Sequence, residues 1–297
     1  MATDVKPDWY QTDVQSINPE AQQLLESYSG LAPDDVLPHV LSLVDLTPYS
    51  SRSFTNSSQR DEAFGIYQYA CIGQMRFLSF NLSHMPFYPR VLEKLRSDPE
   101  AGFLDAGCCF GQELRFLVNQ GIPATRLFGC DLEQVFIDLG YQLFRDKDRL
   151  RATFAVGDLD AENSDFETGQ LTQKLSGKLD VVFASSLFHM WDYDTQFRVA
   201  ARLVKLCRDK PGVMITGRQM GSLVGGHYEM KGMKDGAFHY RHDIETMERF
   251  WSEIGEATQT TWKVEADLYS SEEIEKTKNM PWSDDNYRMI CWCATRQ

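Results

Sequence analysis

Residues 104–115, L-D-A-G-C-C-F-G-Q-E-L-R, have the form of a loop that leads from a strand into a nucleotide-binding helix. Counted from Gly107, a G-x-G-x-x-G fingerprint would place its second and third glycines at Cys109 and Gln112. Without those glycines the backbone cannot approach a pyrophosphate closely, so NAD and FAD fit poorly. No Gly-Lys-Ser/Thr follows to make a P-loop. S-adenosylmethionine (SAM) has no phosphate, and the turn between Gly107 and Gly111 can accommodate a small residue under its methionine portion.

Two further groups follow at the ends of apolar runs. Asp131 could accept hydrogen bonds from both ribose hydroxyls, with Leu132 packed on the adenine. Gly157, Asp158 and Leu159 end the next run, where the acid could accept from the adenine amino group and Leu159 could line its face. Each acid also has a simpler interpretation, Asp131 as a helix cap and Asp158 as a turn former. The order of the three elements favours a nucleoside-type cofactor. The predicted binding set is Asp105, Gly107, Cys108, Cys109, Gly111, Asp131, Leu132, Gly157, Asp158, Leu159 and Ser185.

The elements that position these residues alternate between β-rich runs and amphipathic segments, which predicts βαβ units and a parallel sheet. The predicted strands are Gly102–Ala106, Leu127–Asp131, Ala152–Val156, Leu179–Ala184, Val213–Gly217, Thr260–Leu268 and Tyr287–Ala294. Helices are predicted at Gly111–Asn119, Gln134–Arg145 and Thr195–Cys207. The last strand follows a long polar connection and is expected to insert as a hairpin partner. The fold class is therefore α/β, a Rossmann-like sheet of seven strands with helices on both faces.

Residues 1–97 contain a different pattern, without a sheet of their own. Helices are predicted at Pro19–Tyr28, Pro33–Leu43, Asp61–Tyr69 and Pro86–Arg96, with a polar loop at Thr47–Ser58. We expect an N-terminal helical cap over residues 1–97 and a SAM-binding domain over residues 98–297.

Several longer motifs point to a family. The loop, the G-C-D-L of residues 129–132 and the G-D-L of residues 157–159 resemble class I SAM-dependent methyltransferases. Further stretches resemble the fungal methyltransferases of meroterpenoid and polyketide biosynthesis, namely Tyr69–Phe77, F-L-D-A-G-C-C-F-G-Q, Phe136–Tyr141, Gly217–Gly221 and Tyr240–Glu245. The Thr47–Ser58 stretch looks like an insertion. The resemblance implies methylation of an oxygen, in several members the carboxylate of a farnesylated aromatic acid, and a homodimer.

Candidate groups for the transfer follow the fourth and fifth predicted strands. A carboxylate acceptor is already ionised and needs positioning charges, whereas a phenol benefits from a general base. His189 is the leading base or orienting group, although it could instead cap a helix or pack beside Trp191. Arg218, with Gln219, could hold a carboxylate by a fork of hydrogen bonds, or Arg218 could form a structural salt bridge. Arg241 or His242 could reach the acceptor from the start of a helix capped by Asp243, where a structural role is the default.

The glycine-rich segment Met220–Tyr240 has the composition of a lid that would exclude water from the reaction. A metal-dependent enzyme would want acidic ligands after the fourth strand. That place holds Ser185 and Ser186, so no metal is predicted.

Composition restricts the partners. The net charge of -13 and the lack of a basic, aromatic-interleaved run exclude nucleic acid, and no apolar run is long enough to span a membrane. Seven cysteines without zinc-finger spacing indicate free thiols in a reducing, cytoplasmic compartment. A small apolar or acidic molecule is the expected substrate.

The predicted function is SAM-dependent O-methylation of a fungal secondary metabolite, with a carboxylate favoured over a phenol or enol hydroxyl. A fold does not fix a function, so a SAM-binding cyclase, isomerase or non-methylating partner is the alternative. Release of S-adenosylhomocysteine (SAH) with methylation of an acceptor separates the two.

Overall fold

The computed structural model describes residues 14–42, 70–231, 236–269 and 280–297. Its contacts group the chain into two compact units. The first unit holds Met1–Phe80, Cys109–Gly121 and Gln134–Leu150, and the second unit holds Asn81–Cys108, Ile122–Glu133 and Arg151–Gln297. The predicted cap boundary at residue 97 is not one of the breaks between these units and stays a prediction.

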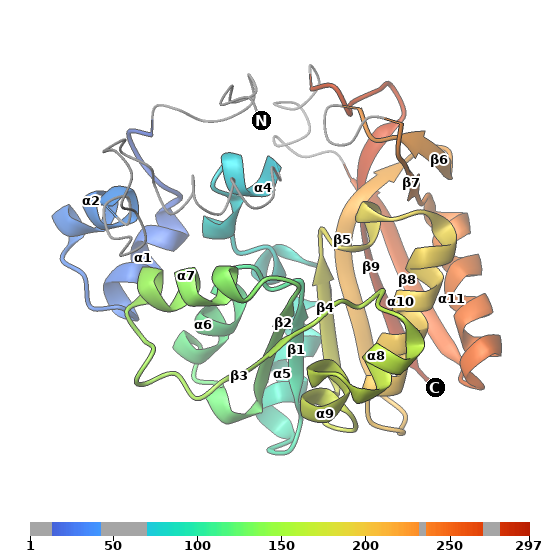
Figure 1. Cartoon of the computed structure of the whole chain (residues 1–297), viewed down its shortest axis with the longest axis horizontal. Coiled ribbons are helices and arrows are strands. Elements are labelled where there is room, and N and C mark those ends of the chain that lie inside the picture. Colours follow the sequence, from blue (N-terminus) through green and yellow to red (C-terminus); the bar gives the residue numbers. More distant parts are fainter. Residues whose placement is uncertain (1–13, 43–69, 232–235, 270–279) are drawn as a thin grey trace. The chain divides into compact units, whose positions relative to one another are not determined.

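The second unit contains the predicted sheet of seven strands, in the order β3-β2-β1-β4-β5-β9-β8 (Figure 1). The strands are β1 (Phe103–Ala106), β2 (Leu127–Asp131), β3 (Thr153–Val156), β4 (Val181–Ser185), β5 (Met214–Ser222), β8 (Trp262–Tyr269) and β9 (Tyr287–Arg296). All neighbours from β3 to β5 are parallel, while β9 pairs antiparallel with both β5 and β8. The expected insertion of the last strand is therefore confirmed.

Helices of the second unit cover both faces of this sheet. On one face, α8 (Asn163–Thr168), α9 (Gln170–Leu175), α10 (Tyr193–Leu206) and α11 (Ile244–Thr258) share a hydrophobic cluster with the strands. Val182 and Ala184 of β4 belong to that cluster, so Phe183 between them faces the other side. There its ring lies 6.4 Å from that of Phe87, which begins α5 (Tyr88–Ser97). These contacts confirm the predicted α/β layering.

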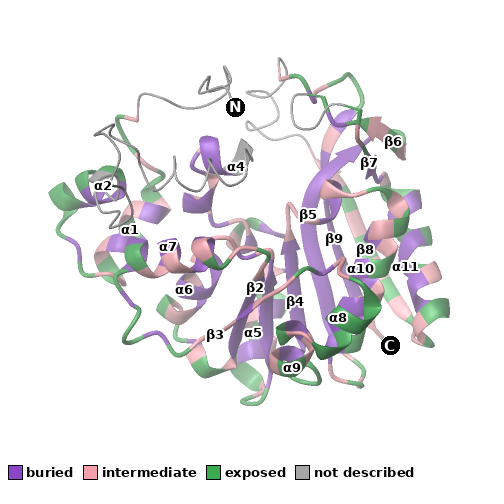
Figure 2. Ribbon diagram, viewed as in Figure 1, coloured by how far each residue is buried: buried purple, intermediate pink, exposed green. Residues whose placement is uncertain are grey.

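Strand β5 is longer than predicted. The sequence indicates an end at Gly217, but β9 pairs with β5 from Met214 to Ser222 and supplies backbone partners to its end. Strand β4 stops earlier, with Ser185 opposite Arg218. All residues of β5 are buried (Figure 2), so Arg218 lies in mid-strand rather than at a strand end.

The segment predicted as a lid contains a hairpin. Strands β6 (Gly226–Glu229) and β7 (Phe238–Arg241) pair antiparallel, and residues 232–235 lie outside the described part. Asp243 then caps α11, as predicted, in a capping box with Thr246. Movement of this segment stays a prediction.

The first unit is helical. It contains α1 (Pro19–Ser27), α2 (Pro33–Ser42), α4 (Ala70–Gly73), α6 (Gln112–Asn119) and α7 (Gln134–Phe144), with the short 3-10 helix η1 (Arg76–Leu78). The N-terminal helices share one hydrophobic cluster with Phe110 and with Phe136, Leu139 and Leu143 of α7. The helix predicted at Asp61–Tyr69 and the loop Thr47–Ser58 lie outside the described residues. Among the described helices, none is long and apolar enough to cross a membrane.

Candidate active site

The loop after β1 has left-handed backbone at three alternate positions. The φ angles are +75° at Gly107, +49° at Cys109 and +67° at Gly111. Such a conformation costs a residue other than glycine roughly 1–2 kcal/mol. Cys109 therefore adopts the backbone of a glycine at the position where a dinucleotide fingerprint has one. Contact of this turn with the methionine portion of SAM stays a prediction.

The start of the loop is tied to the neighbouring strand. The amides of Gly107 and Cys108 both donate to the carbonyl of Cys130 in β2, at 2.9 Å. A Cβ at Gly107 would lie 3.1 Å from the side chain of Leu187. These constraints fix the chain where it leaves β1.

Asp131 and Leu132 lie at the end of β2. The Asp131 carboxylate accepts from the amide of Glu133 at 3.3 Å, as expected of a cap, and its carbonyl accepts from Gly157 at 3.0 Å. Leu132 is 43% exposed, which is unusual for leucine. An acid at a strand end beside an exposed apolar side chain matches the groups that a ribose and an adenine need.

The loop after β3 fits its predicted role less directly. The exposed Asp158 accepts from the amide of Asp160 at 2.8 Å, which is the turn-forming interpretation. Leu159 is buried in the hydrophobic cluster, and its carbonyl accepts from Arg202 at 2.6 Å. Contacts of Asp158 and Leu159 with an adenine stay predictions.

Ser185 and Arg218 lie side by side on the face of the sheet that α5 covers. They are paired in the register of β4 and β5, which places their side chains on one face. The Ser185 hydroxyl is buried and has no hydrogen-bond partner among the described residues. Arg218 is buried, and its Nε donates to the hydroxyl of Tyr269 at 3.1 Å. A buried hydroxyl and a buried cation thus adjoin where β4 ends.

Gln219 does not form the predicted fork with Arg218. Successive residues of a strand point to opposite faces, and Trp292 Nε1 donates to Gln219 Oε1 at 3.3 Å on the other side of the sheet. The prediction that both side chains hold one carboxylate is wrong because β5 is still regular strand here. Tyr269, from the far strand β8, takes that place beside Arg218.

His189 is buried in the short 3-10 helix η4 (Phe188–Met190) after β4. Its carbonyl accepts from Nδ1 of His239 at 2.9 Å, and Nε2 of His239 accepts from Nε of Arg241 at 2.9 Å. Arg241 also donates to Asp284 and to the carbonyl of Trp282, both at 2.7 Å. Burial and the adjacent Arg241 lower the pKa of His239 to about 4. His239 is therefore a neutral ring with one tautomer, and it fixes the turn that bears His189.

His239 was not selected from the sequence, whereas Arg241 was considered together with His242 as a group that could reach the acceptor. Their spacing of two residues within a short strand was the available signal, because it places both on one face of β7.

His242 has the contacts of a structural histidine. It is fully buried between the rings of Tyr193, Tyr240 and Phe250. Its Nε2 donates to Oε1 of Gln196 at 3.1 Å, since the Gln196 amide donates to two carbonyls. Burial lowers the pKa of His242 to about 3. These contacts favour the helix-start interpretation over a catalytic one.

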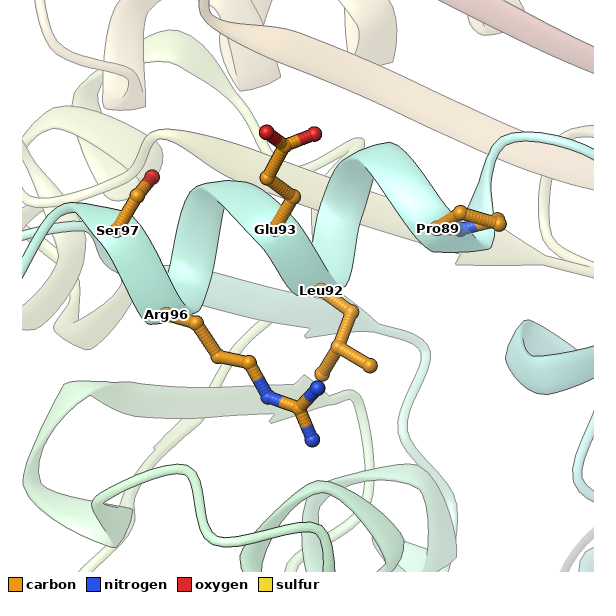
Figure 3. A pocket seen from close by; sticks show the side chains of 5 residues that line it. All are labelled: Pro89, Leu92, Glu93, Arg96 and Ser97. Carbon is orange, nitrogen blue, oxygen red and sulfur yellow. The ribbon is translucent and has the colours of Figure 1, made fainter.

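Two surface hollows are lined by residues other than the predicted site residues. Five residues of α5, Pro89, Leu92, Glu93, Arg96 and Ser97, line the first (Figure 3). The second is lined by Asp192, Tyr193, Asp194, His227, Tyr240, Arg249 and Glu253. Neither hollow includes a residue predicted to hold the cofactor or the acceptor.

The chain is similar to known methyltransferases of fungi. Residues 9–78 match the meroterpenoid methyltransferase N-terminal domain, and residues 104–207 match a methyltransferase domain. The chain is 37% identical to the O-methyltransferase atr3 of Stereocaulon alpinum, over 88% of this chain and 68% of that protein. It is also 37% identical to the O-methyltransferase phiE of a fungal species, over 86% and 78% of the two chains. The Asnovolin E/Chermesin D methyltransferase nvfJ of Aspergillus novofumigatus is 33% identical, over 95% of this chain and 90% of that one.

Proposed function

The chain belongs to the fungal SAM-dependent methyltransferases that carry a meroterpenoid methyltransferase N-terminal domain, and on that premise we propose that it methylates a carboxylate oxygen of a small secondary metabolite. SAM is its cofactor, and when bound it supplies a methyl group on a sulfonium. The match of residues 9–78 to the meroterpenoid methyltransferase N-terminal domain supports a meroterpenoid as the acceptor class.

The residues that would hold the cofactor are those of the three loops. The left-handed turn of residues 107–111 provides room for the methionine portion. Asp131 would accept from the ribose hydroxyls, and the exposed Leu132 would cover the adenine. Ser185 has a buried hydroxyl that can still donate one hydrogen bond.

The buried guanidinium of Arg218 is the observation that carries the proposed acceptor. A guanidinium matches a carboxylate in both charge and bidentate geometry. Tyr269 orients Arg218 from one side, and Ser185 adjoins it in the strand register. A carboxylate needs no proton removed at neutral pH, so Arg218 has to align it and His189 has to orient or confine it. A phenol would need a base instead. In the described part, both ring nitrogens of His239 and Nε2 of His242 have hydrogen-bond partners. Burial also lowers their pKa values to about 4 and 3, which makes both of them weak bases.

The test is a matched set of acceptors. A prenylated aromatic acid, its primary amide and the corresponding phenol without the carboxyl group are each incubated with SAM. SAH release and the mass gain of the acceptor are measured. We expect the acid alone to become a methyl ester, with Arg218→Met raising its KM at least tenfold and leaving the SAH Kd unchanged. Arg249→Met, which removes an exposed cation of α11, is the control. Equal turnover of the phenol, with an unchanged KM in Arg218→Met, would exclude the carboxylate.

Assembly and location extend this proposal. The resemblance to the family supports a homodimer, which light scattering of the purified chain would test. The cysteines Cys108, Cys109, Cys130, Cys207, Cys291 and Cys293 are free thiols, which fits the reducing cytoplasm.

A further inference from the structure

Two sequence motifs to which the proposed cofactor site gives no role, Tyr69–Phe77 and Phe136–Tyr141, meet the cofactor loop at one residue of the first unit, Phe110. Its ring lies 4.4 Å from that of Phe77 and 6.3 Å from that of Phe136. Gly140, on α7, passes so close that a Cβ would lie 2.2 Å from the Phe110 carbonyl oxygen. The residue that follows Cys109 is thus enclosed by side chains of η1 and α7 and by the backbone of α7.

A buried arginine holds the same part of the loop. Nη1 of Arg115, on α6, donates to the carbonyls of Phe110 at 2.8 Å and Gly111 at 3.1 Å. Nε and Nη2 of Arg115 donate to the two carboxylate oxygens of Asp146, at 2.9 and 3.0 Å. Both side chains of this ion pair are fully buried. The guanidinium therefore fixes the direction of two successive carbonyls directly after Cys109.

The ion pair continues to the N-terminal region. The hydroxyl of Tyr28, which caps the C-terminus of α1, donates to Asp146 at 2.7 Å. Burial and Asp146 raise the pKa of Tyr28, so its hydroxyl keeps its proton. A continuous series of hydrogen bonds thus runs from α1 through Asp146 and Arg115 to the loop. Every member lies within the first unit.

The backbone conformation at Cys109 explains what the hydrogen bonds from Tyr28 to the loop could do. A cysteine is strained in the left-handed region, and without external restraint the loop would relax toward φ angles below zero. Fixing the Phe110 and Gly111 carbonyls, and packing the Phe110 ring, holds the strained turn in place before the cofactor arrives.

We propose that Arg115, Asp146 and Tyr28 are positioning residues for the cofactor loop, and that helix α1 thereby contributes to SAM affinity without touching the cofactor. This rests on the proposed role of residues 107–111 in holding SAM. The meroterpenoid methyltransferase N-terminal domain, which includes α1, is then part of the cofactor machinery and not only a cover for the acceptor.

The decisive variant is Arg115→Met combined with Asp146→Leu. Replacing both charges together leaves no unpaired buried ion, and such exchanges are commonly tolerated by the fold. We expect a melting temperature within a few degrees of the wild type and an SAH Kd at least tenfold higher by calorimetry. Hydrogen exchange of the amides in residues 109–114 should be faster in the cofactor-free protein. The milder Tyr28→Phe should raise the SAH Kd about two- to fivefold. Arg126→Met, which removes another arginine bonded to carbonyls, those of Leu95 and Asp98, is the control and should not change it.

Unchanged Kd and exchange in the folded double variant would overturn the proposal. If the double variant does not fold, an unchanged Kd in Tyr28→Phe overturns it instead. Asp131→Ala is measured alongside. If it also binds SAH normally, the proposed cofactor site fails, whereas loss of binding in Asp131→Ala alone refutes only the role of the Arg115 pair.

Discussion

Two regions of the proposed site are held together in different ways. The cofactor edge consists of the loops after β1, β2 and β3. The acceptor edge consists of residues around the ends of β4 and β7 and the middle of β5. At the cofactor edge the hydrogen bonds within each loop are local, such as Asp131 with Glu133 and Asp158 with Asp160. At the acceptor edge the partners are distant in sequence, since Arg218 bonds to Tyr269 and Arg241 to Asp284. In the proposed site, local turns that the ion pair of Arg115 and Asp146 supports from behind would hold the common cofactor, while a network of side chains distant in sequence would shape the place where the acceptor binds. Such a network can change with the acceptor without disturbing the cofactor.

Acid should destabilise the fold through the two buried histidines of the acceptor edge. A histidine in the unfolded chain titrates near 6.5, but His239 and His242 have pKa values of about 4 and 3 in the fold. The unfolded chain therefore binds more protons below pH 6.5, and the free energy of unfolding falls as the pH falls through that window. We expect each of the two histidines to account for a loss of about 3 kcal/mol by pH 4, measured by guanidinium unfolding.

His242→Gln should show a shallower pH dependence than the wild type. The exposed His84→Gln serves as its control and should keep the full slope. Identical slopes in all three proteins would show that the buried histidines do not cause the acid sensitivity.

Asp131→Ala should weaken SAH binding without affecting the acceptor edge. Loss of charge-assisted hydrogen bonds to the ribose should weaken SAH binding by about 1–3 kcal/mol in calorimetry. Asp158→Ala is the matched variant, and because Asp158 is exposed and occupied by its own turn we expect the smaller change. A larger effect at Asp158 would mean that the acid after β3, and not Asp131 at the end of β2, is the main contact of the cofactor.

His189→Ala should slow turnover about tenfold, as the loss of one orienting group, while SAH binds normally. Turnover is followed by SAH release at saturating acceptor. His84→Ala is the control at an exposed position. Wild-type turnover in His189→Ala would remove His189 from the reaction, and a changed SAH Kd would place it at the cofactor edge.

Substitution of Cys109 should have the smallest effect on SAH binding. A β-branched residue is more strained than cysteine in the left-handed region, so Cys109→Val should weaken SAH binding by about 1 kcal/mol. Cys109→Gly has no such strain and should bind within twofold of the wild type. Equal affinities in the two variants would mean that the backbone conformation at residue 109 does not matter for the cofactor.

Local patterns were enough for the sequence to predict individual strands and helix caps. The strand Leu127–Asp131 was predicted with its observed limits, and Asp243 was recognised as a cap, because both depend on residues a few positions apart. The end of β5 was missed because β9, far along the chain, supplies its hydrogen bonds to Ser222. For the same reason Gln219 was assigned to the wrong face.

The buried hydrogen-bond networks could be predicted from the sequence even less than the end of β5. Nothing near His239 in sequence indicates that its ring bonds to the carbonyl of His189, fifty residues away in the chain. The grouping of α7 with the N-terminal helices likewise depends on contacts such as that of Tyr28 with Phe144, whose rings lie 6.3 Å apart. Periodicity identifies the apolar face of a helix but not the partner that this face meets.

The partial exposure of Cys109 has a practical consequence. Of the six cysteines whose burial the structure describes, Cys109 alone is not buried, and the other five lie inside the fold. A thiol-directed fluorophore under mild conditions should therefore attach at Cys109 ahead of those other cysteines, and SAH should slow that attachment. The residue that replaces a glycine thus provides the enzyme with a natural attachment point for an optical sensor of its own cofactor.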